Sequence, residues 1–211
     1  MSKISDKDKK AWEIFINSKD KVLDKDNHTV KKNIYGNEKI IDLHGHNLHD
    51  ANIKIENVRE ANNEQIGDIH VKYSSLKSVI VAKDIIPNII DELPLLSVLA
   101  CFAEGETKVS GAKELRVKES DRLQAIADGL RKINIQHELY EDGIRITGSE
   151  DDISVCPEID SHGDHRIAMS FLIASLRSKN GIYVKDCANI FTSFPNFIEV
   201  MSSLGMKLNE R

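Results

Sequence analysis

Charged residues in the run ELRVKESDR have the types and spacing needed to hold an anionic group. Lys118 and Arg122 lie four positions apart, which would place both on one face of a helix, and Arg116 adds a third cation just upstream. They fall where the predicted helix begins, and the backbone there already presents positive charge. A bound phosphate or carboxylate would relieve this conflict. The run therefore predicts an anion site.

The same run allows a simpler interpretation, a solvated charged face whose residues pair with one another. Glu119 and Asp121 supply the acids for such pairing. In the functional interpretation we expect Arg122 to be exposed, so that replacing it with Ala would cost little stability. Composition alone does not choose between these two interpretations.

A second basic residue opens another predicted helix, in the run DSHGDHR over residues 160–166. Arg166 lies at the start of this helix, and Gly163 permits close approach of the backbone to a ligand. Asp164 and His165 bring titratable groups to the same place. The alternative is a helix-capping Asp beside surface histidines. Two basic helix starts in one domain favour a polyanionic ligand.

The third stretch is the run IIDELP, where two acids follow an apolar segment and open an apolar helix. Asp91 could simply cap that helix while Glu92 complements its dipole. The functional interpretation is a carboxylate available for acid–base chemistry or for binding a hydroxyl group.

The elements that must position these residues alternate between strands and helices. Apolar segments bounded by Gly, Pro or Asn predict strands at residues 69–71, 78–81, 107–109, 144–147 and 182–184. Helical patterns lie between them, at residues 94–103, 118–133 and 166–176. This order predicts an α/β or α+β fold.

Composition limits the class of protein. The chain has 211 residues, 40% of them apolar and 30% charged, with a formal net charge of −5, which is typical of a folded globular protein. It contains no apolar run of the roughly 20 residues that span a bilayer. Its polar N-terminus is unlike a secretory signal. The cysteines at 101, 156 and 187 show neither disulfide nor zinc spacing, which favours the cytoplasm.

The three stretches together resemble 5-enolpyruvylshikimate-3-phosphate (EPSP) synthase. The matching text is IDELPLLSVLACFAEGETKVSGAKELRVKESDRLQAIADGL, then DGIRITG, HGDHRIAMSFLIASL and TSFPNFIEVMSSLGMKL. The resemblance runs from about residue 54 to the C-terminus. ELRVKESDR and GDHRIAM are highly specific in this order and spacing.

The resemblance implies a transferase of the shikimate pathway, which makes aromatic amino acids. The family moves the enolpyruvyl group of phosphoenolpyruvate to the 5-hydroxyl of shikimate 3-phosphate and releases phosphate, with no metal or cofactor. It implies that Asp91 binds and deprotonates the hydroxyl and that Glu119 transfers a proton at the methylene. It also implies substrate-binding roles for Lys118 at the hydroxyls and for Arg122 and Arg166 at phosphoenolpyruvate.

The family fold has two domains of three βαβαββ units each, with the active site in the cleft between them. This chain has about half the usual length, so we expect residues 53–211 to form an incomplete C-terminal domain of about two units. The substrate groups of the N-terminal domain are absent, and residues 190–192 lack a basic residue that some members carry there. We therefore consider a half of a split enzyme with a separate N-terminal-domain chain, or a non-catalytic remnant, beside an active enzyme.

Residues 1–52 have a different character, and we expect a flexible polar segment. The stretch 17–40 is rich in Lys, Asp and Asn, which is typical of a linker. The run DLHG at residues 42–45 resembles the opening of a small MutS-related (Smr) domain, a family linked to nucleic acids. His44, His46 and His49 show no further metal-ligand pattern, and an acidic chain is a poor nucleic-acid binder. Nucleic acid is therefore the weakest of the hypotheses.

Overall fold

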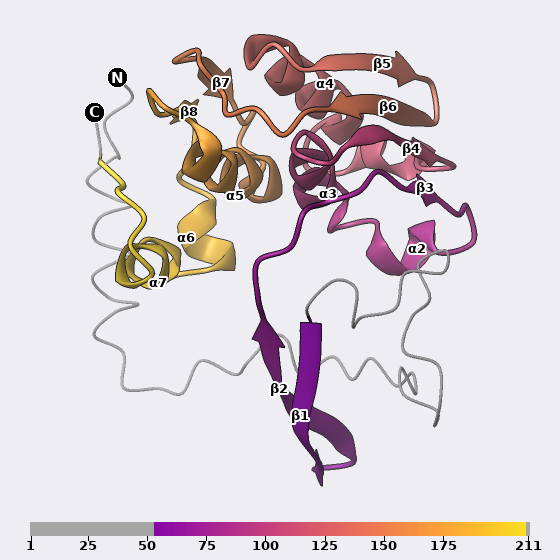
Figure 1. Ribbon diagram of the computed structural model, residues 1–211, viewed down its shortest axis with the longest axis vertical. Coiled ribbons are helices and arrows are strands. Elements are labelled where there is room, and N and C mark those ends of the chain that lie inside the picture. The colour runs from indigo at the N-terminus through magenta and orange to yellow at the C-terminus, as the bar shows by residue number, and fades with distance from the viewer. Residues whose placement is uncertain (1–52, 210–211) are drawn as a thin grey trace. The chain divides into compact units, whose positions relative to one another are not determined.

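The structure is a computed structural model that describes residues 53–209, all within the second of two units of the chain, Ile40–Arg211 (Figure 1). The linker and the DLHG motif predicted in residues 1–52 lie outside the described residues. The strands are β1 (Ile53–Ala61), β2 (Glu64–Val71), β3 (Ile80–Val81), β4 (Gly105–Ser110), β5 (Gln136–Tyr140), β6 (Gly143–Gly148), β7 (Glu158–Asp160) and β8 (Tyr183–Lys185). The helices are α2 (Ile86–Ile89), α3 (Leu93–Ala100), α4 (Arg122–Lys132), α5 (His165–Ala174), α6 (Ile190–Ser193) and α7 (Phe197–Ser203), with 3-10 turns at Lys113–Val117 and Ser175–Arg177.

Strands β1 and β2 form an antiparallel hairpin that the sequence analysis recognised only over residues 69–71. Asn62 and Asn63 connect the strands, and both have positive φ, at 52° and 63°. Consecutive left-handed residues make the tight two-residue turn whose twist suits a hairpin, and Asn tolerates that conformation. The Asn-Asn pair could therefore have been used to predict a turn, and with it the strand β1 that precedes the turn.

The main sheet has the strand order β3-β4-β6-β5. Strands β3 and β4 are parallel, whereas the hairpin β5–β6 joins β4 in antiparallel register. Gly143 begins β6 close to the neighbouring strand, since a Cβ there would lie 2.1 Å from the carbonyl oxygen of Val109. From β3 to β6 the chain thus follows the order βαβαββ, which the family resemblance implied.

A second run begins with the parallel pair β7 and β8, which helix α5 connects. Helices α6 and α7 follow β8, so this run has the order βαβα over the described residues. The expected α/β fold is confirmed. The structure describes one full βαβαββ run and a second that extends through α7.

Helices α3 and α5 form where the sequence predicts them, but the prediction of a helix from residue 118 is wrong. Helix α4 begins at Arg122, because the Asp121 side chain caps it by accepting from the Gln124 backbone N–H at 3.0 Å. Lys118 precedes the helix in extended conformation. Lys118 and Arg122 therefore do not share a helix face.

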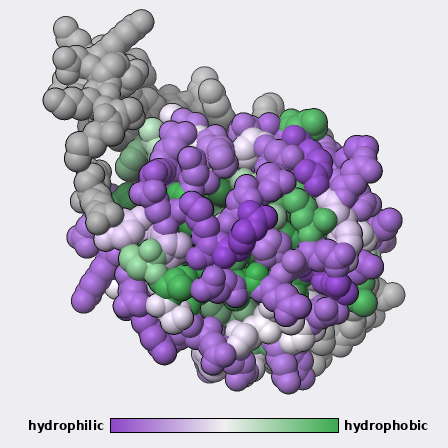
Figure 2. Space-filling view, turned by 90° about the horizontal axis from the view of Figure 1, so that it is seen from above, coloured by the Kyte–Doolittle hydropathy of each residue, from purple (hydrophilic) through white to green (hydrophobic). Residues whose placement is uncertain are grey.

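One hydrophobic core joins the main sheet to helices α3, α4 and α5. Helix α3 packs mainly on α5, and α4 packs on strand β5 (Figure 1). The face seen in Figure 2 is mostly hydrophilic, with hydrophobic residues visible between the polar ones. Gly129 of α4 lets the Phe171 ring of α5 approach, since a Cβ at residue 129 would lie 2.1 Å from its Cζ.

We predict that Gly129→Ala destabilises the protein by about 1–3 kcal/mol, because the added methyl overpacks the contact with Phe171. In an exposed helix the same change would instead stabilise by about 1 kcal/mol. Urea denaturation measures the difference in the free energy of unfolding.

The double variant Gly129→Ala/Phe171→Leu is the control, because the smaller side chain makes room for the methyl group. It should lose less stability than the sum of the two single variants. Strictly additive losses would contradict the proposed packing contact.

Candidate active site

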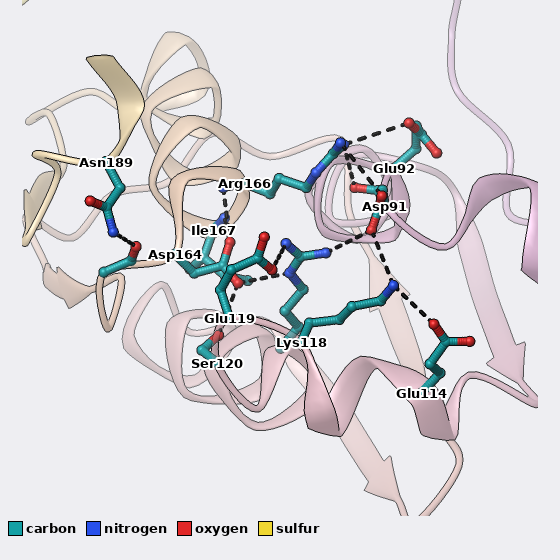
Figure 3. Close-up of polar contacts among 12 residues, drawn as sticks. Asp91, Glu92, Glu114, Lys118, Glu119, Ser120, Asp164, Arg166, Ile167 and Asn189 are labelled. Carbon is teal, nitrogen blue, oxygen red and sulfur yellow. Dashed lines mark hydrogen bonds and ion pairs between the residues drawn. The ribbon is translucent and has the colours of Figure 1, made fainter. Parts of the chain in front are cut away.

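The predicted site residues from three distant stretches meet in one cluster (Figure 3). Hydrogen bonds to a carboxylate of each stretch place the Arg122 guanidinium at the centre of this cluster. Arg122 is the first residue of α4, and only 1% of its surface is exposed. Its Nε donates to Asp164 at 2.7 Å and one terminal nitrogen donates to Asp91 at 2.9 Å. The other terminal nitrogen donates to Glu119. Three of the five guanidinium N–H groups are thus directed at carboxylates.

Asp164 is the buried partner of this arginine, with none of its surface exposed. One carboxylate oxygen caps α5 by accepting from the backbone N–H of Arg166 at 2.9 Å. The other oxygen accepts from Arg122 and from the Ser120 hydroxyl at 3.1 Å. The alternative of a helix-capping Asp is therefore confirmed, and the same side chain also holds the central arginine.

Burial would raise the pKa of Asp164, but hydrogen bonds and the charge of Arg122 outweigh it, so that the pKa lies below its ordinary value. Burial likewise acts to lower the pKa of Arg122, whereas Asp164 and Glu119 raise it above its ordinary value. Each partner thus stabilises the charged form of the other.

Lys118 reaches the cluster from the extended segment before α4. Its Nζ lies 2.9 Å from a carboxylate oxygen of Glu114 and 3.8 Å from one of Asp91. The hydrogen bond with Glu114 is the main reason why the pKa of Lys118 is raised. Asp91 is thus the carboxylate that Lys118 and Arg122 share.

Arg166 lies on the more accessible side of the cluster, with 34% of its side chain exposed. It donates to the backbone carbonyl of Asp91 at 3.0 Å, and its guanidinium lies 3.6 Å from the carboxylates of both Asp91 and Glu92. Arg166 and Lys118 are therefore the cations of the cluster that solvent can reach.

The cluster carries more acids than bases. Three cations face five carboxylates, those of Asp91, Glu92, Glu114, Glu119 and Asp164. An incoming anion must compete with these carboxylates for the same N–H groups. The described residues of the cluster thus supply carboxylates in excess and leave the cations largely neutralised.

Two expectations from the sequence are wrong at this site. Arg122 is buried rather than exposed, because its guanidinium is enclosed by carboxylates from three segments. Arg116 does not join the cluster, because it donates to the carbonyls of Tyr140 and Glu141 and to the Asp121 carboxylate.

Asp91 does not cap α3, since Glu92 occupies the capping position without a side-chain hydrogen bond. The structure instead directs the Asp91 carboxylate at Lys118 and Arg122. Glu114 and Ser120 were not predicted to take part. The four-residue spacing of Glu114 and Lys118 was a usable signal for the first, and nothing in the sequence marked Ser120.

Comparison with known proteins shows the family to which the chain belongs. A family model described as EPSP synthase (3-phosphoshikimate 1-carboxyvinyltransferase) matches residues 29–201. The chain belongs to the EPSP synthase family. The match reaches further toward the N-terminus than the resemblance noted from about residue 54, and it includes the DLHG run.

Curated EPSP synthases from *Magnetococcus marinus* and *Ruthia magnifica* are 45% and 46% identical to this chain over 159 and 161 residues. Each alignment covers 75% of this chain and 36% of the relative. The solved EPSP synthase of *Acinetobacter baumannii* superposes with a TM-score of 0.71 at 45% identity, over 74% of this chain and 37% of that one. The chain thus spans little more than a third of the relatives it matches.

Residues 53–209, the part of the chain that the structure describes, lack two kinds of feature. No group of three or more His, Cys, Asp or Glu residues in this part of the chain is arranged to hold a metal ion. No helix in this part is long and apolar enough to cross a membrane.

We predict that Arg122→Ala lowers the free energy of unfolding by about 3–5 kcal/mol, because it leaves buried Asp164 without its partner. Arg122→Lys should recover little of this loss, since an ammonium group does not reproduce the three-way guanidinium contacts. Chemical denaturation at neutral pH measures the free energy of unfolding of both variants.

Arg131→Ala is the control, since it removes only an exposed ion pair with Asp128 and should cost less than about 1 kcal/mol. A loss for Arg122→Ala as small as this control would show that Asp164 does not depend on Arg122.

A second prediction concerns the stability of the protein at low pH. The pKa of Asp164 is lower in the folded state than its ordinary value of 3.8, so its contribution to stability is fully present above pH 3.8. That contribution is lost as the pH falls through the lower, folded-state pKa. Denaturation curves from pH 5 to about pH 2 should therefore show a steeper loss of stability for the wild type than for Asp164→Asn. Equal slopes would contradict a lowered pKa at this residue.

Proposed function

We propose that this chain is the C-terminal, substrate-binding part of an EPSP synthase, acting on phosphoenolpyruvate and shikimate 3-phosphate. The observation that carries the proposal is the convergence of Asp91, Lys118, Glu119, Arg122 and Arg166 in one cluster of a chain from this family. Both substrates are anions with phosphate groups, which suit Lys and Arg.

The reaction needs two proton movements, and the cluster offers a carboxylate for each. Asp91 accepts the proton of the 5-hydroxyl of shikimate 3-phosphate as the hydroxyl oxygen bonds to C2 of phosphoenolpyruvate. At the same time Glu119 donates a proton to the methylene carbon of phosphoenolpyruvate. Phosphate then leaves from C2 and takes up the proton held by Asp91, while the new methyl group returns a proton to Glu119, which restores the double bond. Because Arg122 contacts both carboxylates, it holds the two acid–base groups at a fixed separation.

Lys118 and Arg166 are the groups that meet the substrates in this proposal. Lys118 binds shikimate hydroxyls beside Asp91, and Arg166 binds the phosphoenolpyruvate anion. Arg122 contributes positive charge from below the protein surface, since its side chain is buried. These roles follow the family resemblance, and the geometry of the cluster supports them.

The excess of carboxylates supports a split enzyme over a self-sufficient one. With five acids around three cations, the cluster attracts polyanionic substrates only weakly. Further cations are needed to offset the acids, and a separate chain carrying the remaining part of the family fold would supply them. We place this pair in the cytoplasm, since Cys101, Cys156 and Cys187 are all free thiols.

The test is phosphate release from phosphoenolpyruvate and shikimate 3-phosphate. It compares this chain alone with a mixture that also contains the part of *A. baumannii* EPSP synthase outside the matched region. We expect turnover only in the mixture. Turnover by this chain alone would overturn the need for a partner, and a stable complex without turnover would favour a non-catalytic remnant.

Within an active mixture, Arg166→Ala should lower the rate by about 100-fold or more, because a charge-stabilising donor is lost. Arg145→Ala is the matched control, since this arginine pairs with Glu106 and Glu138 on the main sheet, outside the cluster. Equal rates for the two variants would argue against a substrate-binding role for Arg166.

A further inference from the structure

The loop from β7 to α5 delivers Asp164 and Arg166 to the cluster through an unfavourable backbone conformation. His162 and Gly163 both have positive φ, at 53° and 71°. The left-handed region is costly for a residue with a side chain such as His162, so neighbouring contacts must hold it. The contacts that stabilise this loop therefore decide where Asp164 and Arg166 lie.

Those contacts come from the last residue of β8 and from the segment that connects β8 to α6. The Ser161 backbone N–H donates to the Lys185 carbonyl at 3.3 Å, and its hydroxyl donates to the Asp186 carbonyl at 2.8 Å. The Asn189 side-chain amide donates to the Gly163 carbonyl (Figure 3). The last contact acts at the loop's second left-handed residue, directly before Asp164.

The side chain of Asn189 contacts the loop and does not cap the helix that it precedes. It occupies the capping position of α6, where an Asn side chain normally accepts from a backbone N–H of the first turn. Helix α6 has no such side-chain hydrogen bond. The amide of Asn189 is directed across to the loop, so the contact serves the loop and not the helix that Asn189 begins.

The two segments are also in close contact. A Cβ added at Gly163 would lie 3.3 Å from a carboxylate oxygen of Asp186 and 3.4 Å from the amide nitrogen of Asn189. A Cβ at residue 163 would thus meet both side chains at close van der Waals distance. The positive φ of 71° is the stronger reason for glycine at this position, because a residue with a side chain would adopt it only with strain.

We propose that Asn189 is a positioning residue for this site. By fixing the Gly163 carbonyl it sets the turn that places Asp164 against the Nε of Arg122 and Arg166 beside Asp91. The residue touches neither substrate nor reacting atoms in this proposal. It rests on the proposed function only in treating the cluster as a substrate site.

The experiment compares Asn189→Ala with Asn180→Ala in the full 211-residue chain. Asn180 is a close match, because its exposed side-chain amide also donates to a backbone carbonyl 26 residues away, that of Ser154. Asn180 precedes β8 in the sequence, whereas Asn189 follows it. NMR follows the titration of the Asp164 carboxyl carbon and the hydrogen exchange of the Arg122 Nε–H. Thermal unfolding of both variants reports the general loss of stability.

For Asn189→Ala we expect the pKa of Asp164 to rise toward 3.8 and the Arg122 Nε–H to exchange about tenfold faster, the factor that one lost hydrogen bond can produce. Asn180→Ala should lower the unfolding temperature without changing either signal. The proposal is overturned if both variants lose stability alike and the Asp164 and Arg122 signals stay at their wild-type values.

Asn189→Asp is the second variant, for the case that Asn189→Ala does not fold. It keeps the size of the side chain but directs a carboxylate oxygen at the Gly163 carbonyl, so it should change the Asp164 and Arg122 signals at least as much. Unchanged signals in this folded variant would also overturn the proposal. Neither measurement needs a substrate, so altered signals combined with no phosphate release in the mixture that contains the rest of the family fold would contradict the proposed function and leave the positioning role intact.

Discussion

The buried pair of Arg122 and Asp164 is the interaction on which the other contacts of the site depend. Asp164 caps α5 and binds Arg122, so one carboxylate fixes both the helix that carries Arg166 and the guanidinium that holds Asp91 and Glu119. A buried charge is tolerated only when it is paired and hydrogen-bonded. The ends of α3, α4 and α5 are therefore held together by charge as well as by the apolar core.

This arrangement assigns different tasks to the three cations. Arg122 organises the acids from beneath the surface, whereas Lys118 and Arg166 stay accessible to solvent. Because the surrounding carboxylates outnumber the cations, the cluster is better suited to acid–base chemistry than to capturing anions unaided. The chain itself covers 36% of the length of the EPSP synthase relatives that it matches.

Local patterns predicted much of the fold, because strands and helices follow from periodicity and capping residues. Helices α3 and α5 and parts of five strands lie where apolar runs and turn residues placed them. Strand β1 was missed although Asn62 and Asn63 marked its turn. The start of α4 was misplaced because its charged residues suit a helix, whereas the Asp121 cap, a local hydrogen bond, starts it later.

The sequence by itself singled out Asp91, Lys118, Glu119, Arg122 and Arg166 as candidates, since charged side chains near helix starts are visible as types and spacings. Only the tertiary structure decided which of these residues are buried and which partners they contact. It buried Arg122, turned Asp91 away from a capping role and directed Arg116 to the β5–β6 turn. The physical reason is that ion pairing depends on which segments meet in space, and Asp164 lies 42 residues along the chain from Arg122. No local pattern carries that information.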